Sequence, residues 1–204
     1  MSLEILLAKL KHPNPYLREQ AMVEIAEQSD ASTIATLMSI LDETDVTYRR
    51  AAVKTLGVIG VDAVPAVIEG LLNSPDPTVR SSCAKALAQV SVNYPDVAFP
   101  GAGLQALRTC IDDFNPVVHI ASVMALGTMG APAFPILAEA LESTDNPAAA
   151  VAIVNALADL KDERSAEVLQ RISEDNSVDS YVKESAISAL SRLEMVTNFR
   201  RSVP

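Results

Sequence analysis

The sequence predicts an all-α protein, an α–α superhelix (a solenoid) of about six helical hairpins. One pattern of about fifteen residues recurs along the 204-residue chain, and the apolar residues within each copy are three and four positions apart, which is the spacing of one helix face. The composition agrees, because small aliphatic residues dominate and the chain has no tryptophan, four tyrosines and four phenylalanines. Side chains of this kind suit closely packed helices better than a β-sandwich.

The copies can be aligned directly. They read NPYLREQAMVEIAEQ from Asn14, DVTYRRAAVKTLGVI from Asp45, DPTVRSSCAKALAQV from Asp76, NPVVHIASVMALGTM from Asn115, NPAAAVAIVNALADL from Asn146 and DSYVKESAISALSRL from Asp179. Successive starts are 31, 31, 39, 31 and 33 residues apart. Every copy begins with Asn or Asp, whose side-chain oxygen accepts a hydrogen bond from the first helical turn, and four continue with proline, which is tolerated at the first helical position. Each copy therefore predicts the start of a helix.

Fixed positions after each cap predict the buried face. Position three is usually apolar, position seven is mostly small, and position eleven is large and aliphatic, namely Ile25, Leu56, Leu87, Leu126, Leu157 and Leu190. A second apolar helix follows at residues 34–41, 64–71, 104–111 and 134–141. Gly57 and Gly60 match Gly127 and Gly130 between the two helices, where glycine ends a helix in the left-handed conformation. The unit is a helical hairpin of the HEAT type, which buries both apolar stripes only by stacking on its neighbours.

We expect one solenoid domain over residues 1–194, opened by an unpaired helix at residues 3–11, and a polar, frayed tail over residues 195–204. Net charge is −10, and the basic residues are spread along the sequence, so binding to nucleic acid is not expected. Two cysteines are too few for a disulfide framework. The N-terminal residues lack the pattern of a signal peptide, and no apolar run approaches the ~20 residues of a membrane span. These features predict a cytoplasmic protein.

The fourth position after the cap is mostly cationic. It holds Arg18, Arg49, Arg80, His119, Ala150 and Lys183. Because the position repeats, we expect a structural ladder in which each cation leans towards the cap of the neighbouring unit.

The third unit is eight residues longer than its neighbours, and the excess at residues 91–103 contains Tyr94 and Phe99. Two interpretations stay open for these aromatic residues, a cover for the hairpin below or a contact loop for a partner.

Catalytic and metal-binding motifs are missing. His12 and His119 are the only histidines, no Cys-x-x-Cys or His-x-x-x-His occurs, and no glycine-rich phosphate loop is present. We therefore expect no catalytic residue and no metal site. Cys83 lies at a core position, whereas Cys110 is expected to be partly exposed. Taken alone, the residues predict an interaction protein with an unspecified partner.

Three segments carry a resemblance to a known family. DVTYRRAAVKTLGVIG from Asp45, DPTVRSSCAKALAQVSVNYP from Asp76 and NPVVHIASVMALGTMG from Asn115 resemble the E/F-type phycobilin lyase family of cyanobacteria and red algae. The short, chaperone-like members of phycoerythrin biosynthesis are the most similar. The resemblance implies an accessory factor that binds a phycobiliprotein subunit, bilin or a partner lyase and assists covalent bilin attachment to a client cysteine. The alternative is a non-catalytic adaptor in phycobilisome turnover or metal-cluster maturation.

The resemblance also implies a ligand. A bilin, bound transiently and not as a permanent cofactor, carries two propionates on an apolar conjugated frame, which an apolar surface rimmed by cations and tyrosine can hold. The candidate bilin-binding residues are Tyr48, Arg49, Arg80, Arg108 and His119. Whether the chain is a lyase subunit or a helper without its own catalytic site stays open.

Overall fold

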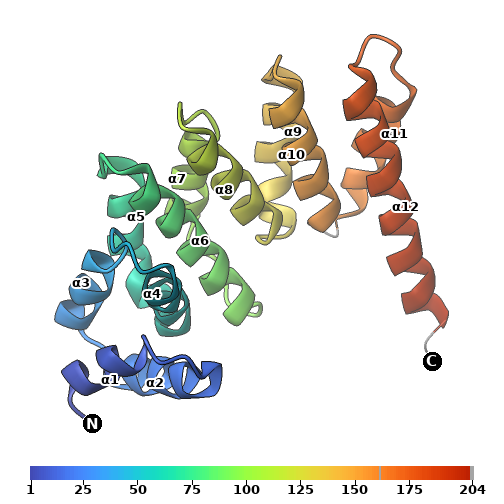
Figure 1. Cartoon of the computed structure of the whole chain (residues 1–204). Helices are drawn as coiled ribbons and strands as arrows, with labels where there is room; N and C mark the ends of the chain where they lie inside the picture. Colours follow the sequence, from blue (N-terminus) through green and yellow to red (C-terminus); the bar gives the residue numbers. More distant parts are fainter. Residues whose placement is uncertain (161, 203–204) are drawn as a thin grey trace. The chain divides into compact units, whose positions relative to one another are not determined.

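The computed structural model describes residues 1–160 and 162–202, and it is helical without a strand in that part of the chain (Figure 1). The α-helices are α1 (Leu3–Lys9), α2 (Pro15–Glu27), α3 (Ala31–Ser39), α4 (Val46–Ile59), α5 (Val64–Asn73), α6 (Pro77–Asn93), α7 (Gly101–Ile111), α8 (Pro116–Gly127), α9 (Phe134–Ser143), α10 (Pro147–Asp159), α11 (Glu163–Glu174) and α12 (Ser180–Ser202). Short 3-10 helices η1 (Gly60–Ala63) and η2 (Ala131–Ala133) precede α5 and α9. The prediction of an all-α repeat fold is confirmed.

Each predicted cap begins a helix by the predicted hydrogen bond. The side-chain oxygen accepts from a backbone N–H two residues later, as Asn14 does from Tyr16 at 3.0 Å and Asp76 from Thr78 at 2.7 Å. The same bond forms at the other four copies, Asp45, Asn115, Asn146 and Asp179. These side chains satisfy N–H groups that have no partner within the helix. The six copies are therefore the starts of α2, α4, α6, α8, α10 and α12, which we call the first helices.

The predicted number of hairpins needs one adjustment. In the described residues a second helix follows each first helix from α2 to α10, and the sixth copy contributes the single helix α12. The helix α1 is the unpaired element predicted at the N-terminal end, and it packs on α2. The sequence after residue 195, predicted to be a polar tail, continues the backbone of α12 to Ser202. Residues 203 and 204 lie outside the described part.

The chain forms two compact units, Met1–Ala125 and Leu126–Pro204. We describe each by itself and call them unit 1 and unit 2. In unit 1, α4 packs between α2 and α6, while α5 contacts α3, α6 and α7 (Figure 1, blue to green). In unit 2, α12 packs on both α10 and α11, and α9 contacts α10 and α11. The prediction of a single domain over residues 1–194 stays a prediction.

The core lies where the repeat predicts it. All six residues at position seven are fully buried, namely Ala21, Ala52, Cys83, Ser122, Ile153 and Ala186. At position eleven, Leu56 and Leu87 in unit 1 and Leu157 in unit 2 are also inaccessible to solvent, whereas Leu190 in α12 is half-buried. Burial of large aliphatic side chains supplies most of the favourable free energy of folding. In each unit, the same face of the first helices therefore forms the core of that unit.

Two of the four matching glycines adopt the predicted left-handed conformation, Gly60 at the end of α4 and Gly130 before η2, whereas Gly57 and Gly127 lie within α4 and α8. Gly60 has a φ of 83° and Gly130 a φ of 68°, which are values that residues with a Cβ rarely adopt.

By length and composition alone, the stretch Val46–Asn73 could cross a membrane, and 56% of its most apolar window is buried in the protein. Gly60 breaks this stretch into α4, of 14 residues, and α5, of 10, with η1 between them. Neither helix alone reaches the ~20 residues that a membrane span needs.

Candidate functional site

The cations at position four hold the loop that precedes their own helix. Arg18 donates to the carbonyl oxygens of His12 and Pro13 at 2.6 and 2.9 Å, and Arg49 donates to the carbonyl oxygen of Glu43. His119 Nδ1 lies against the carbonyl oxygen of Ile111, and Lys183 donates to the side chain of Asn176 at 3.0 Å. The expected structural role is confirmed, but the expected acceptor is wrong. The partner atoms are oxygens of the preceding loop or, for His119, of the last residue of α7, and not the cap of the neighbouring unit.

Arg80 also forms an ion pair with Asp113, which lies in the loop between α7 and α8, just before the cap of the next repeat. Its Nε and Nη2 donate to the two carboxylate oxygens of Asp113 at 2.9 Å each, while Nη1 donates to the carbonyl oxygens of Ser74 and Pro75. Both side chains of the ion pair are more than nine-tenths buried. Burial raises the pKa of Asp113, but the hydrogen bonds from Arg80 and from the Asn115 backbone outweigh it and hold that pKa below its usual value. Arg80 is thus fully occupied by the scaffold.

The remaining candidate bilin-binding residues do not converge on one place. Tyr48 is buried, with the Lys11 ammonium 4.2 Å from its ring centroid. Arg108 is exposed in the last turn of α7, which is a second helix, whereas Tyr48, Arg49 and Arg80 lie near the starts of first helices. Arg49 alone of the five lines a surface hollow described below. As a single bilin-binding group the five residues stay a prediction.

The long loop of the third unit folds back on the protein. The Tyr94 hydroxyl donates to the carbonyl oxygen of Val58, and its ring lies against Gly60, where an added Cβ would meet a ring carbon at 2.7 Å. The Phe99 ring covers Gly103 in the same way. Both aromatic residues therefore act as a cover, and Tyr94 keeps 37% of its surface exposed. Part of the insertion is helical, because α6 extends to Asn93 and α7 begins at Gly101. Contact with a partner stays a prediction.

Both cysteines are buried and therefore poorly accessible to a reaction partner. Cys83 is fully buried, as predicted, but Cys110 is only 5% exposed, so the expectation of partial exposure is wrong. Its thiol points inward against the carbonyl oxygen of Leu71, at 3.9 Å. Burial, and then the nearby Cys110, raises the pKa of Cys83 to about 12; burial, and then Asp113, raises that of Cys110 to about 11. Both thiols are therefore protonated and weakly nucleophilic at neutral pH. The described residues also contain no cluster of three metal-ligating side chains.

The surface of the first helices differs from their core face. Positions two, five and nine after each cap trace a second stripe, which is mostly exposed. On α4, α6 and α8 these positions define what we call the 2-5-9 face, made of Thr47, Arg50, Lys54, Thr78, Ser81, Lys85, Val117, Ile120 and Met124. The residues on α4 and α6 are cationic or hydroxylated, whereas those on α8 are apolar. Because they occupy the same positions, the repeat places them on one side of unit 1.

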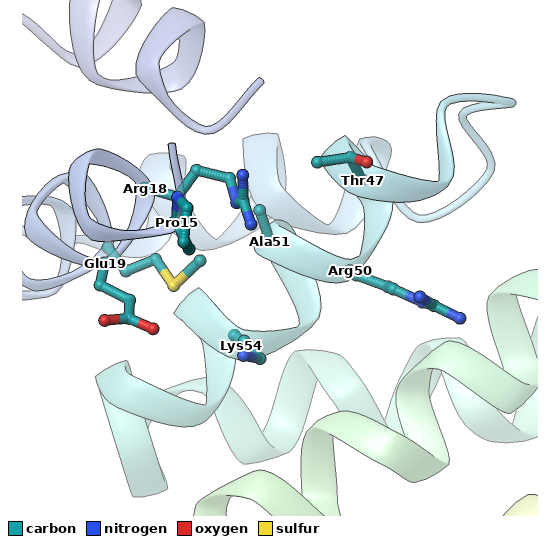
Figure 2. A pocket seen from close by; sticks show the side chains of 8 residues that line it. Pro15, Arg18, Glu19, Thr47, Arg50, Ala51 and Lys54 are labelled. Carbon is teal, nitrogen blue, oxygen red and sulfur yellow. The ribbon is translucent and has the colours of Figure 1, made fainter. Parts of the chain in front are cut away.

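A first hollow lies between α2 and α4. It measures about 330 Å³ and is lined by Pro15, Arg18, Glu19, Met22, Thr47, Arg50, Ala51 and Lys54. Figure 2 shows Arg18 and Ala51 facing each other from the two helices, with Arg50 extending from α4 away from Arg18. The carboxylate of Glu19 lies in the same lining and offsets part of the positive charge. This hollow is therefore of mixed charge.

A second hollow lies between α4, α6 and the start of α8. It measures about 210 Å³ and is lined by Arg49, Pro77, Thr78, Ser81, Ser82, Lys85, Asn115 and Val117. The lining holds two cations, three hydroxyls and an amide, and none of these described residues is a carboxylate. Burial, and then the neighbouring Arg49 and Arg50, lowers the pKa of Lys85. The expectation that basic residues are dispersed is wrong here, because the 31-residue spacing brings α4 and α6 into register.

Known proteins place the chain in a family. The HEAT repeats profile matches residues 3–88 and 104–191. The phycocyanin operon protein Z of Pseudanabaena tenuis is 54% identical over 202 residues, covering 99% of this chain and 100% of that protein. The bilin biosynthesis protein CpeZ of Synechococcus sp. (strain WH8020) is 32% identical over 178 residues, covering 84% of this chain and 95% of that protein.

Solved structures agree on the fold. The complex of CpcE and CpcF of phycocyanin lyase from Nostoc sp. PCC7120 matches with a TM-score of 0.51 at 20% identity, over 76% of this chain and 96% of that chain. Human deoxyhypusine hydroxylase matches with a TM-score of 0.53 at 18% identity, over 95% of this chain and 84% of that chain. At these identities the likeness shows a shared helical-repeat fold. The HEAT-repeat profile and the two sequence relatives identify the chain as a HEAT-repeat protein that belongs to the phycobilin lyase family.

Proposed function

We propose that this protein is an accessory factor of phycobiliprotein maturation, which assists the covalent attachment of a bilin to a cysteine of a phycobiliprotein subunit. The observation that carries the proposal is the match to the bilin biosynthesis protein CpeZ along 95% of that protein. The match to an operon protein named for phycocyanin, at 54% identity, supports the same process. The likeness to the CpcE–CpcF complex supports a partner of the same family.

The chemistry of the described residues favours a helper over a self-sufficient enzyme. Attachment forms a thioether from a thiolate, and both thiols of this chain are buried and have raised pKa values. The reacting cysteine therefore belongs to the client. The chain contributes by holding client, bilin or partner lyase in position, which speeds a reaction through proximity and orientation.

Co-expression tests the proposal. The chain is produced with a phycobiliprotein subunit and the enzymes that make its bilin, with and without a partner lyase of the same family. Covalent bilin is read by fluorescence after denaturing electrophoresis, and client solubility is measured in parallel. We expect bilin attachment, or client solubility, to increase with the chain only when the client and a lyase are both present. Attachment by this chain without a lyase would make it an enzyme, and no effect on any client would overturn the proposal.

A further inference from the structure

We propose that the second hollow of unit 1, together with the apolar residues Val117, Ile120 and Met124 beside it, binds the propionate edge of a linear tetrapyrrole. This inference rests on the proposed function and names a site for its ligand. Arg49 and Lys85 line this hollow, and Arg50, which lines the first hollow, acts on Lys85 from beside it. Of these three cations only Arg49 was a bilin-binding candidate from the sequence.

The charge of the hollow calls for an anion. Lys85 and Arg49 line it, Arg50 lies close enough to Lys85 to act on its charge, and the chain as a whole carries −10. The acid nearest in sequence to this lining is Asp76. As the cap of α6, its side chain already accepts a hydrogen bond from the backbone N–H of Thr78. Arg49 and Lys85 line the hollow without a carboxylate, and they and the nearby Arg50 repel one another, so a bound carboxylate relieves that repulsion. Thr78 and Asn115 add polar groups that can donate to its oxygens, whereas the buried Ser81 hydroxyl already donates to the carbonyl oxygen of Thr78.

The apolar part of the site adjoins the charged part. Val117 lines the hollow, and Ile120 and Met124 follow it at one and two helical turns on the same face of α8. Their exposed fractions are 55, 46 and 65%, which is high for such large apolar side chains. From Val117 to Met124 the face spans about 10 Å along the helix axis. Exposed apolar surface that continues from a charged rim is typical of binding sites.

A linear tetrapyrrole matches both parts. Its two propionates are negatively charged at neutral pH, and its conjugated rings are flat and apolar. The hollow, at about 210 Å³, is smaller than the roughly 300–1,000 Å³ of pockets that enclose a whole small ligand. It can therefore take carboxylates while the rings lie on the apolar residues of α8. Such a half-open site suits a ligand that must be passed on to a client.

The first test is a titration of the purified full-length chain with free phycocyanobilin, followed by visible absorption. We expect a saturable spectral change with the diacid. The dimethyl ester of the same pigment keeps the rings but removes both charges, and we expect it to bind about tenfold more weakly or not at all. Added salt should weaken binding of the diacid, because the cations are accessible to solvent. Equal binding of the acid and the ester would overturn the role of the cations.

Three double variants locate the site. Arg50→Glu with Lys85→Glu reverses two exposed cations of the 2-5-9 face, and Arg171→Glu with Arg192→Glu makes the same change of net charge in unit 2. We expect the first variant to weaken diacid binding at least about tenfold and the second to leave it nearly unchanged. Ile120→Gln with Met124→Gln should weaken the acid and the ester alike. Circular dichroism checks that each variant is folded.

The outcomes separate this inference from the proposed function. If the chain promotes bilin attachment in cells but binds no free pigment, or binds it equally in the two charge-reversal variants, the site is wrong and the function survives. In that case the 2-5-9 face remains a candidate for protein contacts, and charge reversal should then weaken co-purification with a phycobiliprotein subunit. If the pigment binds as expected but attachment never changes, the site is right and the proposed function is wrong.

Discussion

Units 1 and 2 are built from the same repeat but present different surfaces. Positions seven and eleven are filled by the same kinds of buried residue in both. Positions two, five and nine hold Arg50, Lys54 and Lys85 in unit 1, whereas in unit 2 they hold Ala148, Val151, Asn155, Tyr181, Glu184 and Ser188, with no cation in this described set. Position four divides unit 2 instead, because Lys183 of α12 holds its preceding loop as Arg18 does, whereas Ala150 of α10 has no side-chain donor. The core positions therefore encode the fold, and the exposed positions distinguish the units.

The largest expected difference in stability between matched substitutions in the two units comes from Arg80. Arg80→Ala leaves Asp113 buried without its partner, and loss of one member of a buried pair costs about 3–5 kcal/mol of unfolding free energy. The matched change in unit 2 is Arg171→Ala, which breaks an exposed pair with Glu142 worth about 0.2–1 kcal/mol. Urea unfolding followed by circular dichroism compares them. Equal losses would contradict the structural role assigned to Arg80.

Much of this contrast can be predicted from the sequence, and part of it cannot. Caps and core positions repeat at fixed spacing, so the roles of Asn14 and Leu87 follow from one chain. The acceptors of Arg18 and Arg49 do not, because a backbone carbonyl oxygen leaves no mark in a sequence. The burial of Cys110 is also hard to predict, because a shift of one position on the short helix α7 moves a side chain between surface and core.

The candidate site escapes prediction for a related reason. Arg50 and Lys85 are 35 positions apart and look dispersed along the chain. They meet because each lies at an exposed position of consecutive repeats. When the repeats are aligned and their exposed positions are compared column by column, the cationic and apolar parts of the 2-5-9 face become visible in the amino-acid sequence itself.

The two glycines with positive φ give the next largest effect. At Gly130 the space around an added Cβ is open, so Gly130→Ala costs only the backbone conformation, about 1 kcal/mol. At Gly60 the same strain is joined by a clash with the Tyr94 ring, and we expect about 2 kcal/mol or more in total. Thermal unfolding of both variants measures the difference. A larger loss at Gly130 would show that Tyr94 does not lie against Gly60.

Lowering the pH should reduce the stability difference caused by Arg80→Ala, because Asp113 becomes protonated. Its pKa is lowered in the folded protein, so its contribution to stability is present above the ordinary carboxyl pKa and is lost as pH falls through the folded value. The difference in unfolding free energy between the wild type and Arg80→Ala should therefore shrink between about pH 7 and pH 3. The corresponding difference for Arg171→Ala should change little. An Arg80 effect that stays constant down to pH 3 would exclude a charged Asp113 as its cause.

The smallest effect concerns the cover formed by the long loop in unit 1. Tyr94→Phe removes the hydroxyl that donates to Val58 and keeps the ring on Gly60. We expect a loss of about 1 kcal/mol of unfolding free energy, typical of one hydrogen bond. If Tyr94 instead serves a partner, the variant should keep its stability and lose co-purification with that partner.

The most direct test of the whole account measures covalent bilin on a phycobiliprotein subunit co-expressed with a partner lyase under three conditions: no added chain, the wild-type chain, and Arg50→Glu with Lys85→Glu. The account predicts that the wild type increases attachment and that the variant, although folded, gives little more than the condition without the chain. Equal attachment under all three conditions would contradict the account, and equal attachment by wild type and variant would confine the contradiction to the proposed site.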